Sequence, residues 1–356
     1  MLGGYIGNMG LGGNTVFTFG CMLILILFLA GIMLFNAKVK QDACHFFDKK
    51  NSVALRGFWS IIVVLVHVPF VYRNQIQDML GSFAYIGVTF FFMTSAYGLK
   101  YNMGNDVLNG FWKKRLPKLL VPMFFVNVFK IVVLIIKEEK ISLLDFLSIN
   151  GWIWWLLICY FVFWSVHKLS FINIKRKDVY VCIIIIFFSL FVYLIPNKNF
   201  TTWCPEVYGF VFGIMLFHFK EKFISIVNNP WLIKCIFFCM LSGATGLLYL
   251  KFKYVIFFGD YVLKVFLGLL IICFMLSINR KIDMGNKVSL FLGQISYEIY
   301  LLHGCVFGLV AYLFPELESG IYICLCIVIT IIVAYIVNII ARFVINSSRH
   351  MLRFKT

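Results

Sequence analysis

A basic residue and a histidine stand eleven positions apart in an apolar stretch of the chain. Arg56 lies near the start of this stretch, and His67 lies deeper within it. In a helix that rises 1.5 Å per residue, this spacing would place His67 about 16 Å beyond Arg56. Because imidazole titrates near neutral pH, His67 is a candidate general base, with Arg56 orienting a donor or stabilising an oxyanion. The alternative is a histidine that only packs between helices and hydrogen-bonds a carbonyl.

Four basic residues open a later apolar segment and could bind phosphate groups. They are Lys113, Lys114, Arg115 and Lys118, in the sequence FWKKRLPKLLVP. Lysine and arginine are the usual partners of phosphates in proteins, so this cluster would suit a phosphate-bearing substrate that arrives from the cytoplasm. The alternative is an ordinary basic anchor at the end of a membrane segment.

Other polar residues fall inside apolar segments, where ionisable groups are costly and are therefore functional candidates. Ser95 lies in a segment, residues 87–98, that combines hydroxyl groups with small residues suited to close helix packing. Residues 293–303 contain four further candidates: Ser296, Tyr297, Glu298 and His303. Helix packing remains an equally weighted role for His303. Asp260 and Lys264, four positions apart, predict an internal ion pair.

The composition indicates which elements must position these residues. Of the 356 residues, 62% are hydrophobic and 13% are charged, and the mean hydropathy is +0.94. A soluble domain is about half apolar and a quarter charged, so a soluble protein is excluded. The net charge of +17 is spread between apolar runs, which argues for membrane topology and against nucleic-acid binding. We therefore predict an all-α, polytopic membrane helix bundle.

Windows of about 19 residues predict eleven transmembrane helices, and the loop charges predict their orientation. The apolar runs lie near residues 16–36, 54–73, 82–99, 118–136, 150–168, 179–195, 205–219, 230–251, 254–278, 288–312 and 319–341. Most of the 32 Lys and Arg residues fall in alternate loops. This asymmetry predicts that the N-terminus lies outside and the C-terminus lies in the cytoplasm, with the chain in a cell (inner) membrane.

The cysteines and histidines predict neither a disulfide framework nor a metal site. Most of the 11 Cys lie inside apolar runs, where cysteine behaves as a small hydrophobic residue. No CxxC pair is present, and no group of His and Cys has the spacing of metal ligands.

Taken together, the polar segments resemble the acyltransferase-3 family of membrane proteins, which transfer acyl groups, usually acetyl, to carbohydrates. Arg56 and His67 match the basic residue, ten residues and histidine that begin the family core. The other matching segments are residues 87–97, the Arg115 and Lys118 pair in place of RxxR, the W-x-L-like run 152–156 that contains Trp155, and residues 293–303, which resemble G-x-x-S-Y-x-x-Y-L-x-H. Thr89 stands where the family has Asp, and Lys118 stands where it has the second Arg.

The resemblance implies a core of ten helices, preceded here by one extra helix. It predicts three parts: residues 1–50 as an N-terminal transmembrane helix and cytoplasmic linker, residues 51–345 as the acyltransferase core, and residues 346–356 as a cytoplasmic tail.

The resemblance also implies the reaction and its substrates. It predicts an O-acyltransferase that takes acetyl from cytoplasmic acetyl-CoA, with no tightly bound cofactor. The acceptor would be a hydroxyl of a cell-envelope or exported carbohydrate, or of a lipid-linked saccharide. His67 and Arg56 would be catalytic, the basic cluster would bind the donor, and Ser95, Trp155 and the 293–303 segment would line the site. The acceptor's identity, the acyl chain length and the oligomeric state stay open.

A transporter or flippase of a lipid-linked saccharide is the alternative function. Such proteins are expected to show internal repeats and helices broken by Gly or Pro near the midplane. The sequence shows no repeat and contains only 7 Pro, so the enzyme is favoured.

Overall fold

The computed structural model describes residues 13–40, 46–69, 75–102, 108–170, 173–195 and 203–353. Residues 1–12, at the N-terminus predicted to lie outside, and residues 354–356, in the predicted cytoplasmic tail, lie outside the described residues. The helices are α1 (Gly13–Leu34), α2 (Lys49–Val66), α3 (Gln75–Gly81), α4 (Tyr85–Tyr101), α5 (Phe111–Ile136), α6 (Leu143–Phe146), α7 (Gly151–Lys168), α8 (Ile174–Leu194), α9 (Tyr208–His218), α10 (Lys220–Asn228), α11 (Trp231–Phe252), the π-helix η4 (Phe258–Leu263), α12 (Lys264–Lys281), α13 (Lys287–Gln294), α14 (Ser296–Leu313) and α15 (Ser319–Arg353). Two short strands, β1 (Lys38–Val39) and β2 (Ile282–Asp283), pair antiparallel.

The prediction of an all-α, polytopic membrane protein is confirmed. Seven helical stretches of the described residues are long and apolar enough to cross a membrane: Gln75–Tyr101, Phe111–Ile136, Arg176–Leu194, Trp231–Phe252, Phe258–Lys281, Ser296–Leu313 and Ser319–Ser348. Two shorter apolar stretches are also helical, Gly20–Leu34 and Tyr208–His218. Each of the eleven predicted apolar runs contains a helix. The crossing number of eleven stays a prediction.

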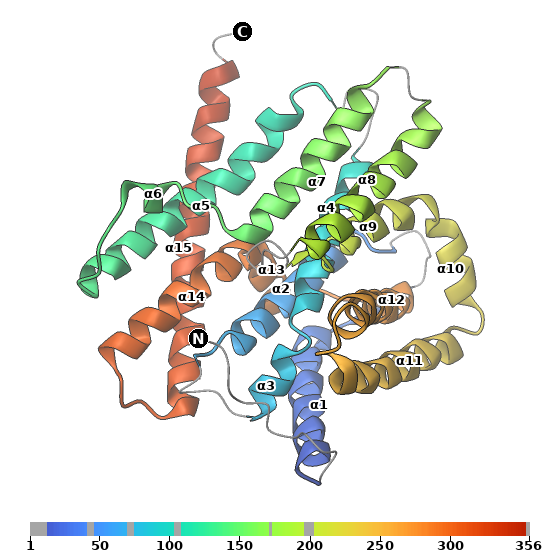
Figure 1. Ribbon diagram of the computed structural model, residues 1–356, viewed down its shortest axis with the longest axis horizontal. Coiled ribbons are helices and arrows are strands. Elements are labelled where there is room, and N and C mark those ends of the chain that lie inside the picture. The colour runs from blue at the N-terminus through green and yellow to red at the C-terminus, as the bar shows by residue number, and fades with distance from the viewer. Residues whose placement is uncertain are drawn as a thin grey trace.

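Helix α2 lies in the middle of the bundle (Figure 1). It contacts α1, α3, α4, α13 and α14. Seven of its residues, from Leu55 to Val66, are apolar and buried, so the helix that carries Arg56 is covered on most of its circumference. The surrounding helices therefore decide what reaches the side chains of α2.

Helix α2 ends seven residues earlier than the apolar run 54–73 suggested. Val66 is its last residue, and His67 is the C-cap, with its N–H bonded to the carbonyl of Val64. Pro69 explains the end, because proline disfavours helical geometry in the residue before it and cannot donate a backbone hydrogen bond. His67 therefore lies at a helix end and is exposed, not within a continuous helix.

The predicted span 288–312 is divided at Ile295 into α13 and α14. Gly293, just before the break, packs against the backbone of α2, and a Cβ there would overlap the carbonyl oxygen of Val53. On α2, a Cβ at Gly57 would lie 2.5 Å from the carbonyl oxygen of Ser289. The two glycines thus allow α13 and α2 to touch backbone to backbone, and α14 starts from this contact.

The predicted ion pair between Asp260 and Lys264 is wrong. Lys264 pairs instead with the buried Glu206 of the neighbouring segment, at 2.7 Å. Asp260 accepts hydrogen bonds from the hydroxyl of Tyr193 and the backbone N–H of Phe257. The reason is local: residues 258–263 form a π-helix, in which the i, i+4 geometry of an α-helix does not hold.

Replacement of Gly293 by alanine should destabilise the protein, because the new methyl group cannot fit without separating α13 from α2. Overpacking of this kind costs about 1–3 kcal/mol, so the midpoint of thermal unfolding in detergent should fall. Gly304→Ala in α14 is the matched control, since its added Cβ has no neighbour within 4 Å. Equal unfolding midpoints for the two variants would contradict the close contact.

Candidate functional site

A pocket of about 360 Å³ lies where α2, α4, α5, α7 and α14 meet. Its lining consists of Arg56, Phe91, Thr94, Ser95, Lys118, Leu119, Trp152, Leu156, Tyr160, Gln294, Ser296, Tyr297, Glu298 and Tyr300. The volume falls within the range of small-molecule sites, roughly 300–1,000 Å³. The pocket brings together six of the residues predicted from sequence: Arg56, Ser95, Lys118, Ser296, Tyr297 and Glu298.

Three buried polar atoms of this pocket have no hydrogen-bond partner. They are Arg56 Nε, Trp152 Nε1 and Glu298 Oε2. A buried donor or acceptor left unpaired costs about 1–3 kcal/mol, so native proteins keep few of them. The other oxygen of Glu298, Oε1, accepts a hydrogen bond from Asn338 Nδ2 at 2.8 Å, which fixes the carboxylate from the α15 side. A polar ligand would satisfy the three remaining atoms.

Two tyrosines shape the wall of the pocket and connect its helices. The hydroxyl of Tyr297 donates to the carbonyl of Leu119 at 2.8 Å and so ties the start of α14 to α5. Tyr160 of α7 is hydrogen-bonded to the side chain of Ser95 of α4. Ser95 therefore helps to hold α4 against α7 at the rim of the pocket.

The structure brings His67 and His303 together. Their ring centroids are 4.7 Å apart. In each ring Nδ1 contacts the carbonyl oxygen four residues earlier: Val63 O at 2.7 Å for His67 and Ile299 O at 3.2 Å for His303. A carbonyl can only accept, so Nδ1 carries the hydrogen and Nε2 of a neutral ring keeps its lone pair.

Tyr300 lies between the pocket and the two histidines. It lines the pocket, its ring centroid is 4.9 Å from that of Trp152, and it is 5.8 Å from that of His303. Neither histidine lines the pocket itself. The candidate site therefore has two parts, a polar pocket beside Arg56 and an imidazole pair farther along α2, which meet at Tyr300.

Besides the two histidines, four residues predicted for the site lie outside its pocket. Lys113 and Lys114 are exposed on the first turn of α5, and Arg115 stacks on the ring of Phe111 at 4.2 Å. Trp155 is buried and packs on Phe188 with a centroid distance of 5.4 Å. Trp152, one turn earlier on α7, lines the pocket instead. Trp155 is thus a packing residue in this structure, because it points to the opposite neighbour, α8.

A second charged cluster was not predicted from the sequence. Asp178 of α8 lies 2.6 Å from Lys100 Nζ, 3.2 Å from His167 Nε2 and 2.5 Å from His218 Nε2. These four residues come from α4, α7, α8 and α9, and only His218 is substantially exposed. Their positions in sequence give no sign of the contact, since each stands alone near a helix end. The cluster ties four helices together.

No three His, Cys, Asp or Glu side chains among the described residues are grouped so that they could hold a metal ion.

A comparison with known protein families identifies the family of this chain. A family model for an acyltransferase domain matches residues 51–339, which is most of the chain. The chain belongs to the acyltransferase-3 family. No curated protein and no solved structure matches it. The protein is accordingly a membrane acyltransferase, and α1 precedes the part that the family model covers.

One departure of this acyltransferase from the family pattern has a structural explanation. Thr89, which stands at the position of the family's Asp, is buried and donates its hydroxyl to the carbonyl of Tyr85 at 3.1 Å. A Cβ at Gly209 of α9 would overlap the carbonyl oxygen of Thr89. The position therefore lies within the close packing of α4 on α9.

Replacement of Asp178 by asparagine should strongly destabilise the acyltransferase, because Lys100 and His167 would lose their carboxylate inside the protein. Breaking a buried ion pair costs about 3–5 kcal/mol. Glu139→Gln, which removes the partner of Lys137 at an exposed site, is the control and should change stability by less than about 1 kcal/mol. Thermal unfolding in detergent measures both. Unchanged stability of the Asp178 variant would show that the cluster does not hold the helices together.

Proposed function

We propose that this acyltransferase moves an acetyl group from acetyl-CoA, bound from the cytoplasmic side, to a hydroxyl of a carbohydrate at the outer side of the cell membrane. The observation that carries the proposal is that α2 leads from Arg56, in a pocket with unsatisfied polar atoms, to His67, whose ring lies against His303.

The donor would enter past the start of α5. Lys113 and Lys114 are exposed there and Lys118 lines the pocket, so they form a basic path for the phosphates of CoA. Arg115, stacked on Phe111, supports this path and does not itself line the pocket. The pantetheine arm would occupy the pocket, with its amides beside the unpartnered atoms of Arg56, Trp152 and Glu298. The thioester at its end would then reach Tyr300 and the imidazole pair.

His67 is the proposed general base. Its Nδ1–H is held by the carbonyl of Val63, so the lone pair of Nε2 is the free basic position. The acceptor hydroxyl attacks the thioester carbon, its proton moves to Nε2, the new C–O bond forms and the C–S bond breaks. The proton then passes to the departing sulfur, so His67 ends the cycle neutral. General base catalysis of this kind contributes about 10²- to 10⁴-fold.

His303 is the proposed positioning residue for His67. His67 lies at the exposed end of α2, and a helix end alone does not fix a side chain. The buried ring of His303, tilted by 57° against it, restricts the orientation of the His67 ring. Arg56, eleven residues before His67, orients the donor from the pocket.

His67→Ala should lower the rate of acetyl transfer from labelled acetyl-CoA by about 10²- to 10⁴-fold, because the acceptor would lose its base. Donor binding should persist in this variant, since His67 lies outside the pocket. Lys118→Ala and Arg56→Ala should instead raise KM for acetyl-CoA or abolish its binding. Purified protein in detergent, with thioester hydrolysis and acetyl transfer as readouts, separates the two effects.

Lys222→Ala is the charge-matched control for Lys118, because Lys222 is an exposed cytoplasmic-loop lysine in the predicted topology. His303→Gln should reduce transfer less than His67→Ala. If folded wild-type protein binds no acyl-CoA, the donor assignment is wrong. If His67→Ala retains full activity, another group is the base.

A further inference from the structure

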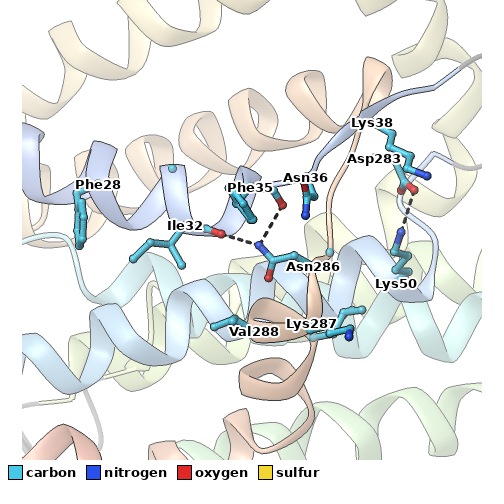
Figure 2. A pocket seen from close by; sticks show the side chains of 13 residues that line it. Phe28, Ile32, Phe35, Asn36, Lys38, Lys50, Asp283, Asn286, Lys287 and Val288 are labelled. Atoms are coloured by element: carbon cyan, nitrogen blue, oxygen red, sulfur yellow. Dashed lines mark hydrogen bonds and ion pairs between the residues drawn. The ribbon is translucent and has the colours of Figure 1, made fainter.

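A large groove separates α1 from α13 and the segment before it (Figure 2). Its volume is about 1030 Å³. It lies outside the candidate active site and shares no lining residue with that pocket. One wall belongs to α1, which precedes the part matched by the family model, and the other wall belongs to the acyltransferase domain.

The α1 wall of the groove is apolar. Phe28 and Ile32 are four residues apart and lie on one face of α1, and Phe35 directly follows the helix. Phe28 is 64% exposed and Phe35 is 68% exposed, and Val288 of α13 faces them across the groove. Gly31 leaves a gap in this wall, because a Cβ there would have no neighbour within 4 Å.

The other end of the groove is cationic. Lys38, Lys50 and Lys287 line it, with Asp283 as the one acidic residue of the lining. Asp283 is already paired with Lys50 at 3.1 Å and accepts a hydrogen bond from Asn51. Partial burial raises the pKa of Asp283, but these two hydrogen bonds outweigh it and keep the pKa below its ordinary value. Asp283 therefore stays ionised and neutralises Lys50, and the net charge comes from Lys38 and Lys287.

Lys38 and Lys287 have no counter-ion within the part of the chain that the structure describes. Both are exposed; Lys38 lies in β1 and Lys287 is the first residue of α13, and the distribution of Lys and Arg assigns both to the cytoplasmic face. An anionic group at this end of the groove would meet two cations at the level of the membrane surface.

Specific hydrogen bonds connect the two walls and fix the distance between them. Strand β1 pairs with β2, so the linker after α1 is fixed to the segment before α13. The side chain of Asn286 donates to the carbonyl oxygens of Ile32 and Phe35 at the end of α1, at 2.6 and 3.2 Å. These bonds fix the end of α1 and so set the width of the groove.

We propose that this groove binds one anionic phospholipid, with its phosphate at the end lined by Lys38 and Lys287 and an acyl chain along the apolar face of α1. The arrangement of charges argues for a lipid over a soluble phosphate compound. A soluble anion would leave the aromatic and aliphatic wall uncovered. A phospholipid has acyl chains that suit the apolar wall and, next to them, a phosphate that suits the cationic end. A neutral lipid would fill the wall but would leave the two lysines without a partner.

The test is lipid retention by the full-length protein, followed by native mass spectrometry in detergent. Dioleoylphosphatidylglycerol should bind more tightly than dioleoylphosphatidylcholine, which has the same chains and no net charge. Lys38→Gln with Lys287→Gln should weaken the phosphatidylglycerol complex about 25-fold, since each lysine near the membrane surface contributes about a factor of five. Gly31→Leu should weaken both lipids, because its side chain fills the gap in the wall.

Each groove variant has a control that makes the same substitutions outside the groove. Lys220→Gln with Lys222→Gln removes two cytoplasmic-side lysines away from the groove, and Gly20→Leu adds the same side chain to α1 where no neighbour lies within 4 Å. Both should bind lipid as the wild type does, with unchanged unfolding midpoints. Equal retention of the two lipids, or wild-type binding by both groove variants, would overturn the proposal. If sn-glycerol 3-phosphate binds and the lysine substitutions weaken it equally, the two lysines bind a soluble phosphate compound and the lipid proposal is wrong.

Discussion

The backbone contact between α2 and α13 is the constraint on which the candidate site depends. Because Gly57 and Gly293 lack side chains, the two helices approach more closely than any pair with Cβ atoms could. The same contact interrupts the apolar run before residue 296, so α14 begins beside α2 and not farther along the chain. The first turn of α14 then delivers Glu298 to Arg56, and its next turns deliver His303 to His67.

Charged groups inside the bundle fall into two kinds, and the difference separates architecture from function. Asp178 has three cationic or ionisable neighbours within 3.2 Å, and Glu206 has Lys264 at 2.7 Å. These groups join helices, and the attraction within each pair offsets the free energy lost when the charges are removed from water. Glu206 Oε2 has no hydrogen-bond partner, and the same holds for Arg56 Nε and Glu298 Oε2. Arg56 and Glu298 differ because they line a pocket, where a polar ligand would satisfy these atoms.

Much of the fold and part of the site could be predicted from the sequence, for identifiable reasons. Apolar runs of about 20 residues predict helices directly. The spacing of Arg56 and His67 predicts that one helical segment connects them, as α2 does. The end of α2 at Val66 was missed because a 19-residue average ignores the local effect of Pro69. Trp152 was passed over for Trp155 because a motif does not tell which face of α7 meets the pocket. The Asp178 cluster could not be found, since its members meet only through tertiary packing.

The imidazole pair shows why geometry adds to a motif. The sequence offers two histidines on two helices, each of which could equally be a packing residue. In the structure, each Nδ1 is bound by a carbonyl of its own helix, and this bond fixes the tautomer that leaves Nε2 basic. His167, which belongs to the Asp178 cluster, makes the same i−4 contact with the carbonyl of Phe163, so this bond alone does not mark a base. What distinguishes His67 is its exposed place at the end of α2, which a substrate could reach.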